Sequence, residues 1–164
     1  MVAISGTASA AMARDERDSM DERSRLHDGY ELSADPGRVD LAAGWAFLSS
    51  EAYWGRWRVP DDFRRQVENA WRVVGCYAAD GAMVGFARAW SDGVASAYLA
   101  DVYVEPGHRG RGLGSAIVQH MVDDGPGREF RWMLHTADAH DLYRRHGFAA
   151  PDGTYLERPS RRPS

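Results

Sequence analysis

The spacing of hydrophobic residues is helical in the first part of the chain. Apolar residues recur three and four positions apart in residues 40–49 and again in residues 60–70, which predicts one amphipathic helix in each range. Asp40 is a residue type that caps helix N-termini, and Pro60 is a residue type that often opens a helix. Residues 30–33 are a short strand candidate before these two helices.

The hydrophobic pattern changes to that of strands after residue 70. Three runs rich in β-branched, aromatic and small apolar residues lie at residues 71–78, 83–91 and 96–104. Asp-Gly pairs separate these runs at residues 80–81 and 92–93, and this dipeptide favours the tight turn of a β-hairpin. The middle of the chain is therefore predicted to be an antiparallel meander of three strands.

Helices and strands alternate after the meander. Residues 113–121 and 138–146 have helical spacing, whereas residues 130–136 and 148–157 have the character of strands. The complete order is β-α-α-β-β-β-α-β-α-β, which predicts the α+β class. We expect a mixed, mostly antiparallel central sheet that is flanked by helices.

The composition indicates a single globular domain. The chain has 164 residues, of which 44% are hydrophobic, and this is enough for one core. We place the domain at residues 28–157. Residues 1–27 show no period and are expected to be a flexible extension, or to precede a later start at Met12 or Met20. Residues 158–164 are expected to be a basic tail.

Charge and cysteine content argue against several kinds of partner. The formal net charge of -4 argues against nucleic acid as the main partner. Cys76 is the only cysteine, which excludes an intramolecular disulfide and fits a reducing compartment such as the cytoplasm. No apolar run approaches the roughly 18 residues that a membrane span requires, so we expect no membrane partner.

The candidate chemistry lies in the loop after the third strand of the meander. Arginines and glycines alternate there as Arg109, Gly110, Arg111 and Gly112, and Gly114 follows. Glycines let a ligand approach the backbone closely, and the unpaired N–H groups at the start of a helix attract anions. The loop is therefore predicted to bind an anion such as a pyrophosphate.

Two common kinds of glycine loop do not fit this sequence. A Walker A loop requires a lysine after its last glycine, and no lysine follows here. A dinucleotide-binding loop requires a third glycine where this chain has Ser115, and it opens its domain instead of following a meander. The remaining pattern is Arg-x-x-Gly-x-Gly, formed by Arg109, Gly112 and Gly114.

This pattern resembles the acyl-CoA loop of the GNAT superfamily of N-acyltransferases. A second element, Leu-Tyr-Arg-Arg-His-Gly-Phe at residues 142–148, matches the same family in order and spacing, and the resemblance extends over residues 28–157. It implies acetyl-CoA as co-substrate and makes a homodimer plausible. The positions that it implies for acetyl-CoA binding are the strand backbone at Val102, Tyr103 and Val104, the loop residues Arg109, Gly110, Arg111, Gly112, Leu113, Gly114 and Ser115, and Thr136, where many relatives have an asparagine.

Two residues are candidate catalytic groups. By the same resemblance, Tyr143 is the proton donor to the CoA thiolate; the alternative is a tyrosine that packs on the core. Asp101 is a charge within an otherwise apolar strand, which is costly unless the side chain faces a cleft. Asp101 is therefore predicted either to bind or deprotonate the amine or to be a structural hydrogen-bond anchor.

Aromatic residues are the candidates for an acceptor site. Tyr53, Trp54 and Trp57 lie in a loop between the first two helices, and Trp90 lies at a strand end. Aromatic walls suit a cationic amine, so we expect N-acetylation of a small-molecule amine. A protein N-terminal or lysine acetyltransferase and a non-catalytic acyl-CoA sensor are the alternatives. Histidines and aspartates at residues 135–146 are too dispersed to share a metal ion, so no metal is expected.

Overall fold

The centre of the fold is one six-stranded sheet. A computed structural model describes residues 23–52, 58–159 and 161. The strands lie side by side in sequence order, as β1 (Arg23–Arg25), β2 (Glu31–Ser33), β3 (Arg72–Tyr77), β4 (Met83–Ser91), β5 (Ser96–Val104) and β6 (Arg131–Met133). Every neighbouring pair is antiparallel except β5 and β6, which are parallel. The predicted α+β class with a mixed, mostly antiparallel sheet is confirmed.

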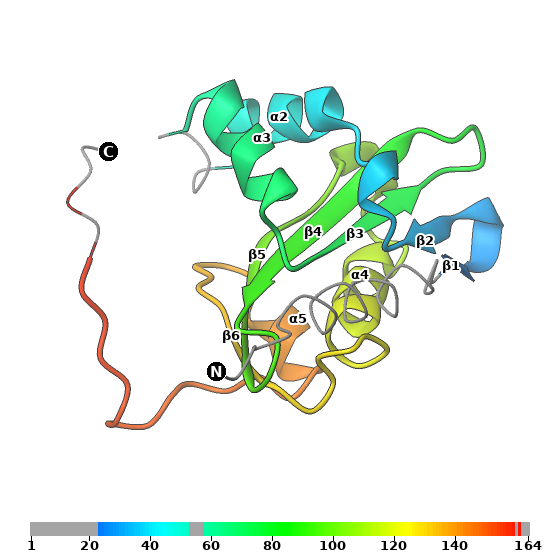
Figure 1. Cartoon of the computed structure of the whole chain (residues 1–164). Coiled ribbons are helices and arrows are strands. Elements are labelled where there is room, and N and C mark those ends of the chain that lie inside the picture. The colour runs from blue at the N-terminus through cyan, green and yellow to red at the C-terminus, as the bar shows by residue number, and fades with distance from the viewer. Residues whose placement is uncertain (1–22, 53–57, 160, 162–164) are drawn as a thin grey trace, which may run out of the picture.

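Helices cover both faces of this sheet. Figure 1 shows α2 (Leu41–Ser50) and α3 (Pro60–Glu68) on one face, and α4 (Leu113–Val122) and α5 (His140–Arg144) on the other. Each face has its own buried cluster: Phe47, Phe63 and Phe86 belong to the first, and Ile117 and Met121 to the second. No helix in the described part of the chain has the length and apolar character needed to cross a bilayer.

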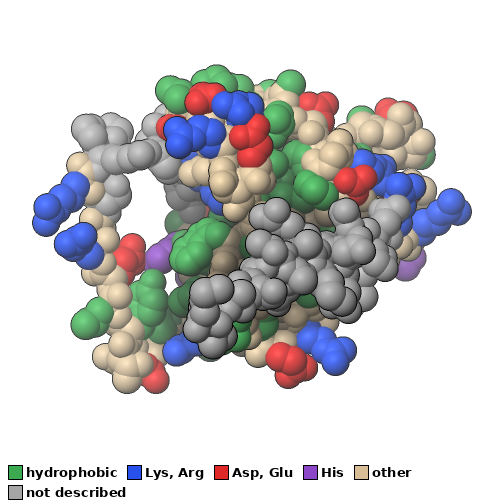
Figure 2. Space-filling view, viewed as in Figure 1, with side chains coloured by type: hydrophobic (Ala, Val, Ile, Leu, Met, Phe, Trp, Pro, Cys, Tyr) green, Lys and Arg blue, Asp and Glu red, His purple; other side chains and the backbone are tan. Residues whose placement is uncertain are grey.

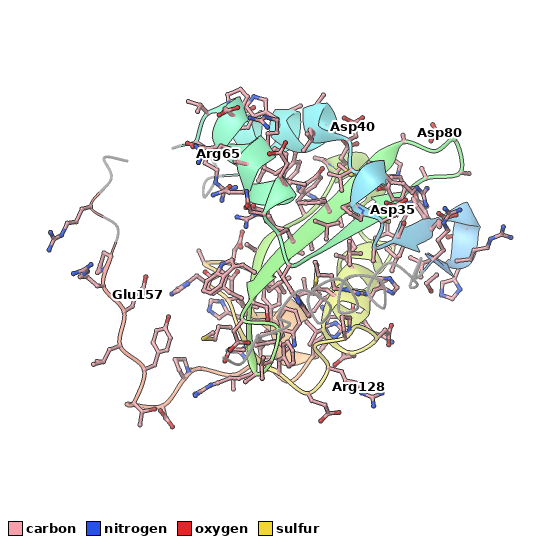
Figure 3. All side chains as sticks on the ribbon, in the orientation of Figure 1. Asp35, Asp40, Arg65, Asp80, Arg128 and Glu157 are labelled. Atoms are coloured by element: carbon pink, nitrogen blue, oxygen red, sulfur yellow. The ribbon has the colours of Figure 1, made fainter. Side chains whose placement is uncertain are left out.

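Local sequence signals account for the starts of several elements. The Asp40 carboxylate accepts hydrogen bonds from the N–H groups of Ala42 and Ala43 at 2.9 Å each, which satisfies two of the free donors at the start of α2. Pro60 opens α3 as expected. Gly81 adopts a positive φ of 86° in the turn between β3 and β4, where Figure 3 labels the neighbouring Asp80.

The two ends of the sheet differ from the expectation. No strand forms among residues 148–157. Phe148 packs against the core, and residues 149–157 form an exposed segment that runs away from the body, as Figures 1 and 2 show. This segment contains Pro151 and an Asp-Gly turn, which weaken strand pairing. The sheet instead gains β1 at its other edge, where it pairs with β2. Residues 23–25 of β1 precede the expected domain start at residue 28.

Candidate active site

The two parallel strands separate and leave one edge of β5 open. They pair only through Ser96–Tyr98 of β5, opposite Arg131–Met133 of β6. Among the described residues, no strand pairs with this edge of β5 beyond Tyr98. A cavity of about 570 Å³ lies at the open stretch, and it is lined by Phe47, Val102, Tyr103, Val104, Arg109, Gly110, Gly112, Leu113, Gly114, Ser115, Ala139, Leu142, Tyr143 and Arg145. Unpaired strand backbone in a cavity can pair with an extended ligand.

The glycine loop forms one wall of this large cavity. Gly110 and Gly112 have φ values of 76° and 77°, and a Cβ atom at either would meet no atom within 4 Å. Internal packing therefore does not exclude a side chain there; the left-handed backbone does, and the open space beside it is available to a ligand. Gly112 is also the N-cap of α4 and supplies no side-chain cap, unlike Asp40 of α2. The first N–H groups of α4 are thus suited to an anion.

The loop arginines have different positions. Arg109 lines the large cavity, and its Nε donates a hydrogen bond to the Val104 carbonyl at 2.8 Å. Arg111 is exposed and is not part of the cavity wall. A third arginine, Arg145 of α5, lines the cavity and was not expected, although it belongs to the Leu-Tyr-Arg-Arg-His-Gly-Phe element. The structure therefore brings Arg109 and Arg145, but not Arg111, to the cavity.

Ser115 lies in the first turn of α4, after Leu113 and Gly114. Ser115 lines the large cavity, and its Oγ lies 2.8 Å from Nε2 of His146, which follows α5. This contact joins the two sequence elements that carry the family resemblance. No local pattern in the sequence indicates this contact, because the partners are 31 positions apart.

Tyr143 lies where the large cavity meets a second, smaller one. The small cavity has a volume of about 70 Å³ and is lined by Leu99, Ala100, Asp101, Val102, Thr136, Asp138, Ala139 and Tyr143. Val102, Ala139 and Tyr143 line both cavities. The Tyr143 residue is 9% exposed, and its ring packs edge-to-face on Phe148 with a centroid distance of 5.8 Å. The tyrosine thus faces the ligand space while it packs on the core.

Asp101 is buried at a bulge in β5. Three steps along β5, from Ala100 to Tyr103, lie opposite two steps along β4, and Asp101 has a positive φ of 54°. Its Oδ2 accepts hydrogen bonds from Arg58 at 2.8 Å and from Arg88 at 2.6 Å. Its Oδ1 is buried and has no hydrogen-bond partner among the described residues. The carboxylate therefore anchors two arginines and keeps one oxygen unengaged beside the small cavity.

The two arginine partners of Asp101 were not among the site residues predicted from the sequence. Arg88 interrupts the apolar run of β4 as Asp101 interrupts that of β5, so the same argument applied to both. Arg58 comes from the chain before α3 and carried no comparable signal. Both arginine side chains are less than one tenth exposed.

Thr136 has a local structural role. Its Oγ1 accepts a hydrogen bond from the Ala139 N–H at 3.0 Å, just before α5. The residue lines the small cavity and is not part of the wall of the large one. Thr136 therefore lies beside Tyr143 and Asp101, away from the glycine loop.

The expected aromatic acceptor residues are only partly described. Tyr53, Trp54 and Trp57 lie outside the described residues. Trp90 is 52% exposed and lines neither cavity; its ring stacks on Tyr98 at a centroid distance of 5.1 Å. The Tyr98 hydroxyl is in turn 2.7 Å from His135, whose other nitrogen contacts Glu157, labelled in Figure 3 on the C-terminal segment.

No metal centre is apparent in the described ranges. Within residues 23–52 and 58–159, no three side chains of His, Cys, Asp or Glu converge in an arrangement that could hold a metal ion. His135 and His146 instead contact Tyr98 and Ser115.

Comparisons with known proteins agree with this architecture. A solved GNAT-family acetyltransferase structure from Xanthomonas campestris pv. campestris is 31% identical, with a TM-score of 0.75, and the match covers 84% of this chain and 96% of that one. Serotonin N-acetyltransferase 2 of Oryza sativa is 38% identical over 74 residues, which is 43% of this chain. Streptothricin acetyltransferase of Streptomyces lavendulae is 38% identical over 87 residues, which is 48% of this chain.

The curated relatives match over less than their full lengths. The matches span 37% of the Oryza sativa protein and 44% of the Streptomyces lavendulae protein. The family model described as acetyltransferase (GNAT) family matches residues 40–148. This range includes every lining residue of both cavities. The chain belongs to the GNAT acetyltransferase family.

Proposed function

We propose that this protein is an acetyl-CoA-dependent N-acetyltransferase that modifies a primary amine of a small molecule. Use of acetyl-CoA is a property of the family to which the chain belongs. The observation that carries the proposal is the shared position of Tyr143, which lines both the cavity of the glycine loop and the cavity of Asp101. A donor in the first cavity and an amine in the second would meet beside this tyrosine.

The large cavity offers suitable groups for each part of acetyl-CoA. The backbone of Gly110 to Ser115 would hold the pyrophosphate, because the glycines leave space and the start of α4 has no side-chain cap. The open edge of β5 at residues 102–104 would pair with the pantetheine arm. Thr136 lies outside the large cavity, in the wall of the small one, and its hydroxyl accepts a hydrogen bond from the Ala139 N–H. It retains its own proton, which we propose it donates to the end of this arm beside Tyr143.

The chemistry requires two proton transfers. Acetyl-CoA supplies an acetyl group activated as a thioester; a C–N bond forms as the C–S bond breaks. Tyr143 donates its phenolic proton to the departing thiolate. A phenol with a pKa of about 10 is a weaker acid than a thiol with a pKa of about 8.5, so this donation is partly stabilisation by a hydrogen bond. Asp101 Oδ1 holds the acceptor amine and accepts the proton that the nitrogen loses, directly or through water.

The acceptor is proposed to be an amine with an aromatic or apolar body. The small cavity of about 70 Å³ has room for an amine group and little more, so the body of the acceptor must lie outside it. The exposed Trp90 and its stacked partner Tyr98 offer an aromatic surface. We also propose Tyr53, Trp54 and Trp57 as acceptor-binding residues, on the grounds of their sequence alone. The names of two relatives, which refer to serotonin and streptothricin, supply candidate amines.

A screen of acceptors tests this proposal. Purified protein is mixed with acetyl-CoA and with serotonin, streptothricin, simple alkylamines or a lysine peptide, and release of free thiol is followed. Amine-dependent release with a small molecule supports the proposal. Release with the peptide alone would identify a protein acetyltransferase. Tight binding of acetyl-CoA without release from any amine would identify a sensor and overturn the proposal.

The Tyr143→Phe variant tests the catalytic assignment. It keeps the ring that packs on Phe148 and removes the proton donor. We expect kcat to fall by about a hundredfold or more while affinity for acetyl-CoA is retained. Tyr155→Phe, at an exposed tyrosine outside both cavities, is the matched control. Full turnover by Tyr143→Phe would refute the role of the tyrosine as proton donor.

A further inference from the structure

The imidazole of His146 lies between two polar side chains of the α4 segment. Its Nε2 is 2.8 Å from Ser115 Oγ, and its Nδ1 is 3.5 Å from Asp123 Oδ2. The His146 side chain is 8% exposed, whereas that of Asp123 is 52% exposed. Ser115 lines the large cavity at the first turn of α4. A continuous row of side chains therefore leads from the solvent, through a buried imidazole, to the proposed pyrophosphate site.

The neutral imidazole would turn the serine away from an anion. Nδ1 faces a carboxylate, so the neutral ring keeps its proton on Nδ1 and leaves only a lone pair on Nε2. Ser115 must then donate its hydroxyl proton to Nε2. The serine oxygen would present only lone pairs to the cavity, and these repel a phosphate oxygen.

The protonated imidazole reverses this hydrogen bond. With hydrogen on both ring nitrogens, Nε2 donates to Ser115 Oγ and Nδ1–H faces Asp123. The serine proton is then free to donate to a phosphate oxygen in the cavity. The imidazolium also places a positive charge one hydrogen bond away from that anion.

We infer that His146 is a positioning residue for binding of the CoA pyrophosphate. His146 acts by orienting the Ser115 hydroxyl, and protonation of its imidazole is coupled to CoA binding. This inference rests on the proposed function. If protonation favours binding, binding must by linkage favour protonation, so the protein takes up a proton when it binds CoA. Asp123 Oδ2 lies at ion-pair distance from the ring, 3.5 Å from Nδ1.

Other charged groups lie on the elements that meet at His146. They are Asp123 and Asp124 after α4, Asp141, Arg144 and Arg145 on or after α5, and Arg109 and Arg111 in the glycine loop. Arg144 is paired with Asp141, and Arg109 donates to the Val104 carbonyl. Among the described residues, Asp123 is the carboxylate at ion-pair distance from the His146 ring.

Calorimetric titration with dephospho-CoA tests the coupling. This probe keeps the pyrophosphate and lacks the terminal phosphate monoester, which itself titrates near pH 6. We expect the wild-type affinity to fall about tenfold as the pH rises from about 5.5 to about 8. Titrations in buffers with different ionisation enthalpies should show proton uptake on binding at the middle of this range.

Four variants separate positioning from a merely structural role. His146→Gln should bind dephospho-CoA with no pH dependence and no proton uptake, whereas His140→Gln, an exposed histidine on α5, should match the wild type. Asp123→Asn, at a half-exposed position, should move the pH profile to lower pH even if the His146 variant folds poorly. In a Ser115→Ala background, His146→Gln should have no further effect.

The outcomes are distinct. Retained pH dependence in His146→Gln, an equal effect of His146→Gln with and without Ser115, or an unchanged profile in Asp123→Asn would each overturn the inference. The same holds if pantetheine, which lacks the pyrophosphate, shows the same pH dependence as dephospho-CoA. Failure of the folded wild-type protein to bind CoA at any pH would instead overturn the proposed function.

Discussion

The Oδ2 atom of Asp101 lies 2.6 Å from Nε of Arg88, and both side chains are almost completely buried. Arg58 donates to the same oxygen, while Oδ1 is left without a hydrogen-bond partner among the described residues. The bulge in β5 and the positive φ of Asp101 give the carboxylate this position. One buried carboxylate in the wall of the small cavity therefore neutralises charge on two arginines through Oδ2 and has a second oxygen without a hydrogen-bond partner among the described residues.

Replacing Asp101 by asparagine should destabilise the protein. The change leaves two buried guanidinium groups beside a neutral amide, and breaking a buried ion pair in this way costs about 3 kcal/mol or more. Denaturant unfolding measures the loss. Glu129→Gln is the control, because it removes an exposed ion pair with Arg128, which is worth about 1 kcal/mol or less. Equal stabilities of the two variants would contradict the anchoring role of Asp101.

Replacing Gly112 by valine should abolish tight CoA binding. Its φ of 77° disfavours a β-branched residue, and the new side chain would project into open space beside the large cavity. We expect affinity for CoA to fall at least tenfold in calorimetric titrations. Gly107→Val is the control, since a Cβ there also meets no atom within 4 Å but the residue lines neither cavity. Unchanged binding by Gly112→Val would refute the glycine-loop assignment.

Cys76 should be inert toward thiol reagents in the folded protein. It is completely buried, and this burial raises the pKa of its thiol to about 11. At about pH 8 the thiolate that reacts is therefore scarce as well as inaccessible. A thiol reagent should label the protein only after denaturation, so that thiol release in the acetyltransferase assay reports CoA alone. Rapid labelling of the native protein would show that β3 opens.

Alkaline pH should destabilise the fold through two buried tyrosines. Burial raises the pKa of Tyr103 above its ordinary value and raises that of Tyr77 to about 12, against the opposing effect of Arg38. The unfolded chain, with tyrosine pKa values of about 10, then binds fewer protons than the folded one, so stability falls as the pH rises. The contribution is complete below about pH 10 and is lost as the pH rises through about 12.

Denaturant unfolding between about pH 8 and about pH 11 measures this effect. Tyr103→Phe should make the decline less steep, and it should cost little stability at neutral pH because the Tyr103 hydroxyl has no hydrogen-bond partner among the described residues. An equally steep decline in Tyr103→Phe would assign the effect to other groups.

Features that depend on neighbouring residues were predictable from the sequence. The Asp40 cap, the Pro60 start and the hairpin at residues 80–81 follow from contacts within a few positions, and the structure confirms them. The strand expected at residues 148–157 was wrong. Whether a short run becomes a strand depends on an available sheet edge, and its own residues do not decide this.

The sequence by itself determined the helices, the central meander, the glycine loop and the family, because these depend on local backbone chemistry and on spacing. Only the tertiary structure decided the surroundings of the candidate catalytic groups. Asp101 meets Arg88 and Arg58 from positions 13 and 43 residues away, and Ser115 meets His146 from 31 residues away. Such contacts arise when packing of the sheet against its helices brings distant side chains together, and no local pattern encodes that distance.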